Sequence, residues 1–222
     1  MTNRLVTFDL YSALIDVESS LVPEVGRLLG AADHAGLVRT WRARQLDYTL
    51  LGTLLSRGHL AFRDLTARAL DCALRQYGLA LAEAGRAELI EAWIRLRPWP
   101  EAEEVLAELQ RRGHKIALLS NGDEAMLRAQ AGHFPVAFEA IFAADQAGVY
   151  KPHPAIYGLP LAALGLAPEE VFHVAGSGRD VMGAKAAGLR CYWSNRAGEA
   201  LLEPALAPDA EFPDLRGLLE VL

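Results

Sequence analysis

LVTFDL, at residues 5–10, is the segment that decides the predicted fold. It is a short apolar run with β-branched and aromatic residues, which is typical of a buried strand. The run closes on Asp9 and Leu10, and an unpaired carboxylate in such apolar surroundings is costly in free energy. Asp9 therefore needs a partner or a function, and the carboxyl end of this strand is the first candidate position for a site.

Four more short apolar runs follow in the second half of the chain, and helical patterns lie between them. The predicted strands cover residues 115–120, 140–144, 171–175 and 191–194, and helices are expected around residues 101–112, 124–132, 155–164 and 181–187. Short buried strands that alternate with helices indicate a parallel sheet covered on both faces. The sequence thus predicts an α/β fold with a Rossmann-like, doubly wound parallel sheet.

The stretch between the first and second strands has a different pattern. Between residues 17 and 97 apolar side chains recur at helical spacing, and convincing strand signals are lacking. Gly58, Gly78 and Gly85 are expected to end helices. We predict four or five helices here.

Pro98 and Pro100 mark the return to the strand-and-helix pattern. The first strand precedes the helical stretch and the other strands follow it, so the helices are expected to be an insertion in the sheet domain. We predict a core domain of residues 1–14 and 98–222, with residues 15–97 forming an inserted helical cap subdomain.

Composition excludes several classes of partner. The 222 residues are 52% hydrophobic and 23% charged, with a formal net charge of −6. This acidic balance argues against nucleic acid, because no basic stripe exists to meet phosphates, and no apolar run approaches the roughly 20 residues of a membrane span. Two cysteines without CxxC spacing, and an N-terminus without an apolar signal region, predict a cytoplasmic protein.

Polar residues stand where the predicted strands end. They are Asp9 after the first strand, Ser120 and Asn121 after the second, Lys151 after the third, and Ser177 with Asp180 after the fourth. Each has an ordinary reading as a helix cap or turn residue. Ligands bind beyond the carboxyl ends of such strands, however, so the group favours one shared site. There Lys151 would keep Asp9 ionised, and an ionised carboxylate can act as a nucleophile.

These residues resemble the motifs of the haloacid dehalogenase superfamily, and most of all those of the L-2-haloacid dehalogenases. The segments that carry the resemblance are FDLYSALIDV at residues 8–17, WRARQLDYT at 41–49, LSNG at 119–122 and VYKP at 149–152, with Tyr157. It covers nearly the whole chain, the cap included. It implies that Asp9 attacks C2 of a short L-2-haloacid, and that water then hydrolyses the aspartyl ester to release a D-2-hydroxy acid.

The resemblance also implies a role for each site residue. Arg42 and Asn121 would receive the departing halide, and Ser120 would bind the substrate carboxylate. Lys151 and Asp180 would organise the nucleophile and the water. The residues expected to bind substrate in the pocket are Tyr11, Leu46, Phe62, Tyr157, Ser177 and Arg179. A small anionic substrate and halide are thus the expected partners, and a homodimer is the implied assembly.

Tyr11 argues against a metal-dependent phosphatase. Phosphatases of the superfamily carry a second aspartate at this position, and their last loop opens with Gly-Asp where this chain has Ala175-Gly176. Asp180 is the only acidic residue between residues 172 and 187, so a hard cation would lack ligands. The six histidines have no metal-ligand spacing. We expect neither a metal nor a cofactor.

Several positions depart from the dehalogenase pattern. The usual Gly-Thr is Ser12-Ala13, so the threonine hydroxyl that helps to position the nucleophile is expected to be absent. In the last loop Ala175 replaces a serine, Ser177 an asparagine and Arg179 a tryptophan. Such losses would slow ester hydrolysis, while Arg179 would add an anion site. Two alternatives stay open: ring opening of a cyclic amino acid such as azetidine-2-carboxylate, and a catalytically impaired protein that binds a small anion.

Overall fold

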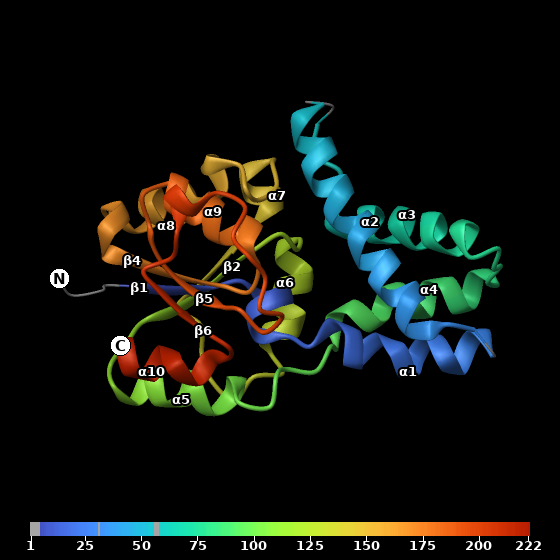
Figure 1. Cartoon of the computed structure of the whole chain (residues 1–222), viewed down its shortest axis with the longest axis horizontal. Coiled ribbons are helices and arrows are strands. Elements are labelled where there is room, and N and C mark those ends of the chain that lie inside the picture. Colours follow the sequence, from blue (N-terminus) through green and yellow to red (C-terminus); the bar gives the residue numbers. More distant parts are fainter. Residues whose placement is uncertain (1–4, 31, 56–57) are drawn as a thin grey trace.

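A six-stranded sheet with helices packed on it forms one part of the molecule, and helices α1–α4 lie beside it (Figure 1). The structure is a computed structural model and describes residues 5–30, 32–55 and 58–222. The strands are β1 (Leu5–Phe8), β2 (Ile116–Ser120), β3 (Ala140–Ala143), β4 (Val171–Ala175), β5 (Arg190–Ser194) and β6 (Ala210–Phe212). They pair in parallel in the order β3-β2-β1-β4-β5-β6, which confirms the predicted α/β fold.

Helices cover both faces of this sheet. The core helices are α5 (Ala102–Arg111), α6 (Glu124–Ala131), α7 (Ala144–Ala147), α8 (Pro154–Leu164), α9 (Gly178–Ala186) and α10 (Leu218–Val221). In Figure 1, α5 and α10 lie on one side of the sheet and α8 and α9 on the other. Strand β6 is absent from the prediction, because its three residues, AEF, include an exposed glutamate and no apolar run.

Strand β1 holds the centre of the sheet, between β2 and β4. The chain order runs outward from β1 in both directions, and such a switch point opens a crevice at the carboxyl ends of the strands. The strand ends at Phe8, two residues before the predicted end. Asp9 turns the chain there, because its side chain accepts the backbone N–H of Ser12 and begins the π-helical turn Leu10–Leu14. Asp9 therefore stands at the mouth of the crevice.

The predicted cap consists of four helices and a short 3₁₀ turn. They are α1 (Val17–Leu29), α2 (His34–Leu54), α3 (Phe62–Gln76), α4 (Glu83–Glu91) and the turn Ala92–Ile94. The two chain segments that join cap and core run side by side: Ile15 and Pro98 form an antiparallel bridge, and the Trp99 N–H donates to the Leu14 carbonyl at 2.9 Å. This pairing supports the predicted boundaries at 14/15 and 97/98, which we keep as a proposal. Residues 1–4 of the predicted core lie outside the described residues.

The glycine predictions have mixed outcomes. Gly78 has a φ of 64° and follows the last residues of α3, as predicted for a helix end. The prediction for Gly85 is wrong, because this residue lies inside α4. A Cβ there would come within 3.0 Å of the Leu81 side chain, so close packing explains the glycine at this position.

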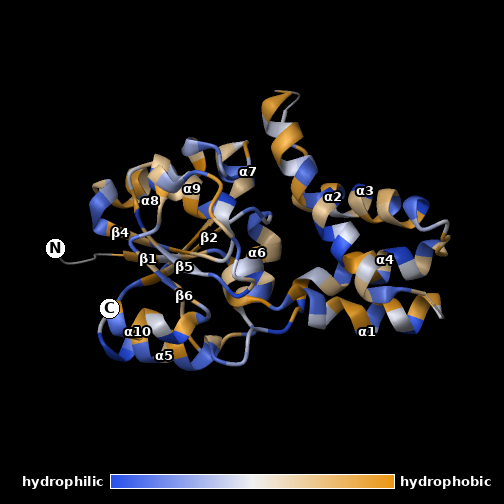
Figure 2. Ribbon diagram, in the orientation of Figure 1, coloured by the Kyte–Doolittle hydropathy of each residue, from blue (hydrophilic) through white to orange (hydrophobic). Residues whose placement is uncertain are grey.

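The end of α2 reaches beyond the other helices beside the sheet and is coloured as largely apolar in Figure 2, while Thr53 near this end accepts the Tyr150 N–H at 3.1 Å. Three leucines near this end are exposed: Leu51 by 55%, Leu54 by 77% and Leu55 by 64%. Exposed leucines that gather on one helix end are more typical of an interaction surface than of a solvated one.

Candidate active site

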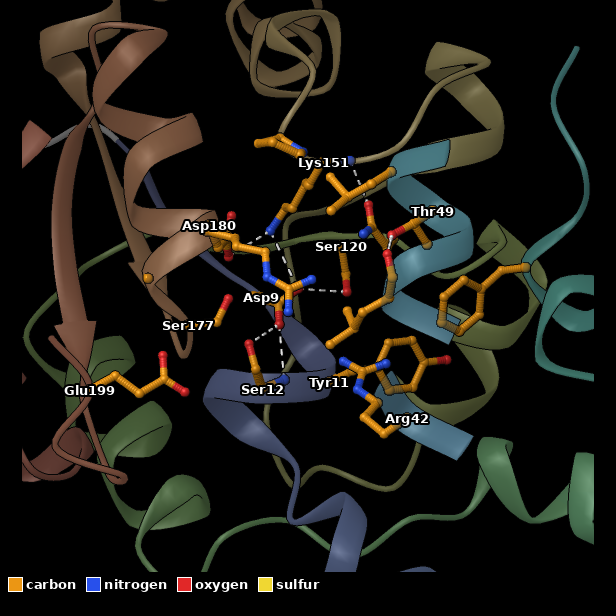
Figure 3. Close-up of a pocket in the computed structure, with 17 residues that line it drawn as sticks. Asp9, Tyr11, Ser12, Arg42, Thr49, Ser120, Lys151, Ser177, Asp180 and Glu199 are labelled. Carbon is orange, nitrogen blue, oxygen red and sulfur yellow. Dashed lines mark hydrogen bonds and ion pairs between the residues drawn. The ribbon is translucent and has the colours of Figure 1, made fainter. Parts of the chain in front are cut away.

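Asp9 is held by hydrogen bonds on both of its carboxylate oxygens (Figure 3). Its Oδ2 accepts the Ser12 hydroxyl at 2.6 Å and the Ser12 N–H at 2.9 Å. Its Oδ1 accepts the Ser120 hydroxyl at 2.9 Å and the Lys151 ammonium at 3.3 Å. The side chain is buried apart from the part that lines a cavity. Four donors thus fix the orientation of this carboxylate.

The hydroxyl that was expected to be absent is supplied by Ser12. Ala13 is fully buried and has no hydroxyl, but the Ser12 side chain turns back onto Asp9. The last loop packs tightly against this turn, since a Cβ on Gly176 would lie only 2.2 Å from the Ser12 carbonyl carbon. The threonine hydroxyl is thus absent, as expected from Ala13, and the neighbouring Ser12 provides a hydroxyl to Asp9 in its place.

Lys151 lies between two buried carboxylates. Its ammonium is 3.3 Å from Asp9 Oδ1 and 3.0 Å from Asp180 Oδ2. Burial acts to raise the pKa of Asp180, but the Lys151 charge, the His173 ring and the Tyr157 hydroxyl hold that pKa well below its ordinary value. The amide N–H of Lys151 donates to Asn121 Oδ1 at 2.7 Å, which anchors the backbone beside the site.

His173 belongs to this network, although the sequence indicated only a core residue. It is fully buried on β4, with its Nε2 at 3.1 Å from Asp180 Oδ2 and its Nδ1 at 2.9 Å from the Thr7 hydroxyl. Nε2 also lies 3.3 Å from the Lys151 ammonium, which can only donate, whereas the Asp180 carboxylate can only accept. The neutral ring therefore has a partner at Nε2 in either tautomer, and the Thr7 hydroxyl can donate to Nδ1 or accept from it. The sign of this network in the sequence is that two polar residues, Thr7 and His173, lie within otherwise apolar strand segments.

The neutral state of His173 predicts a pH-dependent stability. Burial lowers its pKa below the ordinary 6.5, so the unfolded chain binds a proton that the folded protein does not as the pH falls through that value. We expect the free energy of unfolding to drop by about 1 kcal/mol more in the wild type than in His173→Gln between pH 7.5 and 5.5. Urea titrations at the two pH values measure this, and equal drops would contradict it.

Two residues expected to bind substrate have hydrogen-bond partners among the site carboxylates, and Ser120 also lines the cavity above Asp9. The Ser120 hydroxyl, predicted to bind the substrate carboxylate, donates to Asp9 and accepts the Leu10 N–H at 3.4 Å. Tyr157, predicted to bind substrate, is fully buried and does not line the cavity above Asp9. Its hydroxyl donates to Asp180 Oδ1 at 2.8 Å, so it positions Asp180.

Arg42 and Asn121 offer donors that other side chains leave free. The Arg42 guanidinium donates to Gln45, packs 5.6 Å from the Trp93 ring centre and 6.0 Å from that of Tyr11, and forms no ion pair within the described part of the chain. Burial lowers its pKa, and the charge of Asp9 opposes that shift. The Asn121 oxygen is taken by the Lys151 amide, which leaves its NH₂ group as a donor.

A cavity of about 190 Å³ opens above Asp9. Most of the predicted site residues line it: Asp9, Tyr11, Arg42, Leu46, Phe62, Ser120, Asn121, Lys151, Ser177, Arg179 and Asp180. Thr49, Leu50 and Glu199 also line it and were not predicted. The rings of Tyr11 and Phe62 stack at 5.3 Å and form an apolar wall. The space suits a small molecule with one apolar side.

Helix α3 is aligned on the sheet part of the molecule by a contact that sequence reasoning missed. Asp123 of the core accepts the N–H groups of Phe62 and Arg63 at 2.8 and 3.0 Å, and so caps the first turn of α3. A carboxylate is favourable at a helix N-terminus. Asp123 follows the Ser120-Asn121-Gly122 turn directly, so the turn that holds the nucleophile also places Phe62 in the pocket wall.

The side chains around the site also bear on whether it could hold a metal ion. Among residues 5–30, 32–55 and 58–222, no group of three His, Cys, Asp or Glu side chains is arranged to hold a metal ion. The Lys151 ammonium takes the place between Asp9 and Asp180 where two carboxylates would otherwise attract a cation.

Within residues 5–30, 32–55 and 58–222, no helix is both long enough and apolar enough to cross a membrane.

Comparison with known proteins finds several that are similar over most of the chain. A family model described as haloacid dehalogenase-like hydrolase matches residues 3–188. The (S)-2-haloacid dehalogenase of Pseudomonas sp. (strain YL) is 36% identical over 220 residues, which cover 97% of this chain and 93% of that protein. Haloacetate dehalogenase H-2 of Moraxella sp. (strain B) is 32% identical, with 98% and 96% covered.

A solved structure extends the likeness to the fold. The L-2-haloacid dehalogenase of Xanthobacter autotrophicus with chloropropionic acid covalently bound has a TM-score of 0.88 to this chain and is 30% identical. The match covers all of this chain and 98% of that one. Sheet and cap therefore share one arrangement in the two proteins.

Proposed function

Because the chain belongs to the haloacid dehalogenase-like hydrolases, we propose that it hydrolyses the carbon–halide bond of short L-2-haloacids, giving halide and a D-2-hydroxy acid. One observation carries this proposal most: a buried aspartate with four donors on its two oxygens faces a small cavity that also exposes two free donors. The names of the relatives support carbon–halide hydrolysis over ring opening of a cyclic amino acid.

In the first step an oxygen of Asp9 attacks C2 of the substrate from the side opposite the halogen. The new C–O bond forms as the carbon–halide bond breaks, so the configuration at C2 inverts and the halide leaves with the bonding electrons. Arg42 and the Asn121 NH₂ group lie on the cavity with free N–H donors and stabilise the departing anion. Tyr11 and Phe62 keep this part of the site dry.

In the second step water attacks the carboxyl carbon of Asp9, and the hydroxy acid leaves as the ester C–O bond breaks. Each Asp9 oxygen has two donors, so whichever oxygen remains the carbonyl keeps two hydrogen bonds as negative charge develops on it. Asp180 is the second carboxylate on this part of the cavity and orients the water. The water supplies its oxygen to the Asp9 carboxylate and one proton to the product hydroxyl, and its second proton is released to solvent, so one proton accompanies each halide ion.

Halide release tests this function directly. The purified protein with (S)-2-chloropropionate should release one chloride for each molecule of (R)-lactate formed, and the (R) substrate should give neither product. Chloride is followed by an ion-selective electrode and lactate by chiral chromatography. Chloride release from both enantiomers would count against the proposal. The absence of chloride release from any 2-haloacid would also count against it, and would favour an impaired binding protein.

Ser12 offers a test of the altered first motif. Ser12→Ala removes one donor from Asp9 Oδ2 and keeps the backbone N–H, so we expect kcat to fall about ten- to a hundredfold, because a hydrogen bond to a charged group contributes about 1.5–3 kcal/mol. Ser12→Thr keeps the hydroxyl and is the matched control. Steady-state kinetics measure both variants, and equal rates for the two would refute the role of the hydroxyl.

The homodimer and the cytoplasmic location stay predictions. The exposed leucines at the end of α2 support a self-association surface. Cys72 and Cys191 are free thiols, which suits a reducing compartment. Light scattering at two or more concentrations distinguishes a dimer from a 24.1 kDa monomer.

A further inference from the structure

The cavity above Asp9 joins a second, larger cavity between the core and the predicted cap. The second cavity has a volume of about 500 Å³, against about 190 Å³ for the first. Six residues line both of them: Tyr11, Ser12, Arg42, Leu46, Arg179 and Glu199. A substrate whose C2 lies against Asp9 therefore has room to extend its side chain past these residues into the larger space.

Two of the four arginines around the second cavity already have carboxylate partners, and Arg42 donates to Gln45. The Arg39 guanidinium is 2.7 Å from Glu18, and Arg196 pairs with Glu101. Arg179 differs, since it has no hydrogen bond, ion pair or ring contact with any residue in the described ranges. Its side chain is exposed, so its guanidinium presents N–H donors to the two cavities and to solvent and not to the protein.

Arg179 also lies at a fixed place relative to the chemistry. It stands in the first turn of α9, directly before Asp180, whose carboxylate is locked by Lys151 and Tyr157. Arg42 also lines both cavities, so the two arginines face the same space. One of them lies against the aromatic wall of the inner cavity, and the other stands at the junction of the two cavities.

We propose that Arg179 binds a second carboxylate of the substrate, so that the enzyme prefers 2-halodicarboxylic acids of about four carbons over simple 2-haloalkanoic acids. A guanidinium matches a carboxylate with two parallel N–H donors, which adds both energy and orientation. The inference rests on the proposed function and names its substrate class. Arg179 then binds the distal carboxylate while C2 lies at Asp9.

Two carboxylates on the second cavity oppose a doubly charged substrate. Asp16 lines it while its side chain accepts the Ser19 N–H at the start of α1. Glu199 stands at the junction itself, and within the described residues its carboxylate has no partner. Removing the Glu199 charge should therefore change dicarboxylate binding in the direction opposite to removing Arg179.

The test compares two four-carbon substrates that differ in charge, (S)-2-chlorosuccinate and (S)-2-chlorobutanoate. For the wild type we expect the ratio of kcat/KM for the first to that for the second to exceed about ten. Arg179→Met should lower this ratio about ten- to a hundredfold, mainly through KM for chlorosuccinate, and Glu199→Gln should raise it. Arg39→Met, on the same cavity but already paired with Glu18, is the matched control and should leave the ratio near its wild-type value.

A wild-type preference for chlorobutanoate, or equal effects of Arg179→Met and Arg39→Met on the ratio, would overturn the inference. The larger cavity would then hold an apolar side chain. Turnover of 2-chloropropionate with no preference for the dicarboxylate would overturn this inference and leave the proposed function standing. The absence of halide release from all three substrates would overturn the proposed function itself.

Discussion

Asp9→Asn is expected to lower kcat for halide release by at least about ten-thousandfold, because the variant lacks the nucleophile. The amide is similar in size to the carboxylate and sits among the same four donors, so the fold should persist. Its neutral oxygen is a poor nucleophile, and its NH₂ group would face donors on Ser12 or on Lys151. Chloride release in a stopped assay with a tenfold excess of enzyme measures the loss.

Asp71→Asn is the matched control for this variant. Asp71 lies on the surface of the predicted cap, where it pairs with Arg86 at 2.7 Å, and it does not line the cavity above Asp9. This change should leave kcat near the wild-type value. If Asp9→Asn kept more than about a tenth of the wild-type rate, and Asp9→Ala did the same, another group would have to form the bond to C2.

Lys151→Met is expected to cost about a thousandfold or more in kcat/KM, since it removes the only ammonium beside two buried carboxylates in the described chain. Without this charge the pKa of Asp180 rises, because the Lys151 charge is among the interactions that lower it. A raised pKa means that Asp180 regains its charge only as the pH rises. The residual activity of Lys151→Met should therefore increase with pH over a range in which the wild type is constant.

Stability must be measured beside activity for this variant. Loss of one partner from a buried ion pair typically destabilises a protein by about 3–5 kcal/mol, so thermal unfolding should show a clear drop. Lys115→Met is the matched control, because Lys115 is exposed and pairs with Glu139 at the surface. Lys151→Arg keeps the positive charge in a side chain of different shape, so it shows whether the charge alone is sufficient. A pH–rate profile of Lys151→Met that parallels the wild type would contradict the assigned role of the ammonium.

The sheet and most of the site residues could be predicted from the sequence because they follow local rules. Apolar runs mark β1, β2, β4 and β5, and parallel strands bring their carboxyl ends together. The polar residues after those strands therefore had to meet at one edge, and Asp9, Ser120 and Lys151 do meet there. Strand β6 escaped prediction because an edge strand of three residues has no apolar pattern to detect.

Contacts that depend on the exact path of the backbone could not be predicted. Ser12 reaches Asp9 only because residues 10–14 form a π-helical turn, which no propensity rule indicates. His173 looked like a core residue, since its partners Thr7 and Asp180 lie on β1 and on α9. Asp123 has the appearance of an ordinary turn residue, and its role as a cap for α3 depends on how the two parts of the chain meet.

The fate of the oxygen atom from water tests the aspartyl-ester mechanism most directly. In a single turnover in ¹⁸O-labelled water, with enzyme in excess over (S)-2-chloropropionate, the label should enter the Asp9 carboxylate and not the lactate. Mass spectrometry of the peptide that contains Asp9 should then show one ¹⁸O atom at that residue, with all other carboxylates unlabelled. Label in the lactate with none in Asp9 would mean that water attacks C2 itself, and would contradict the mechanism.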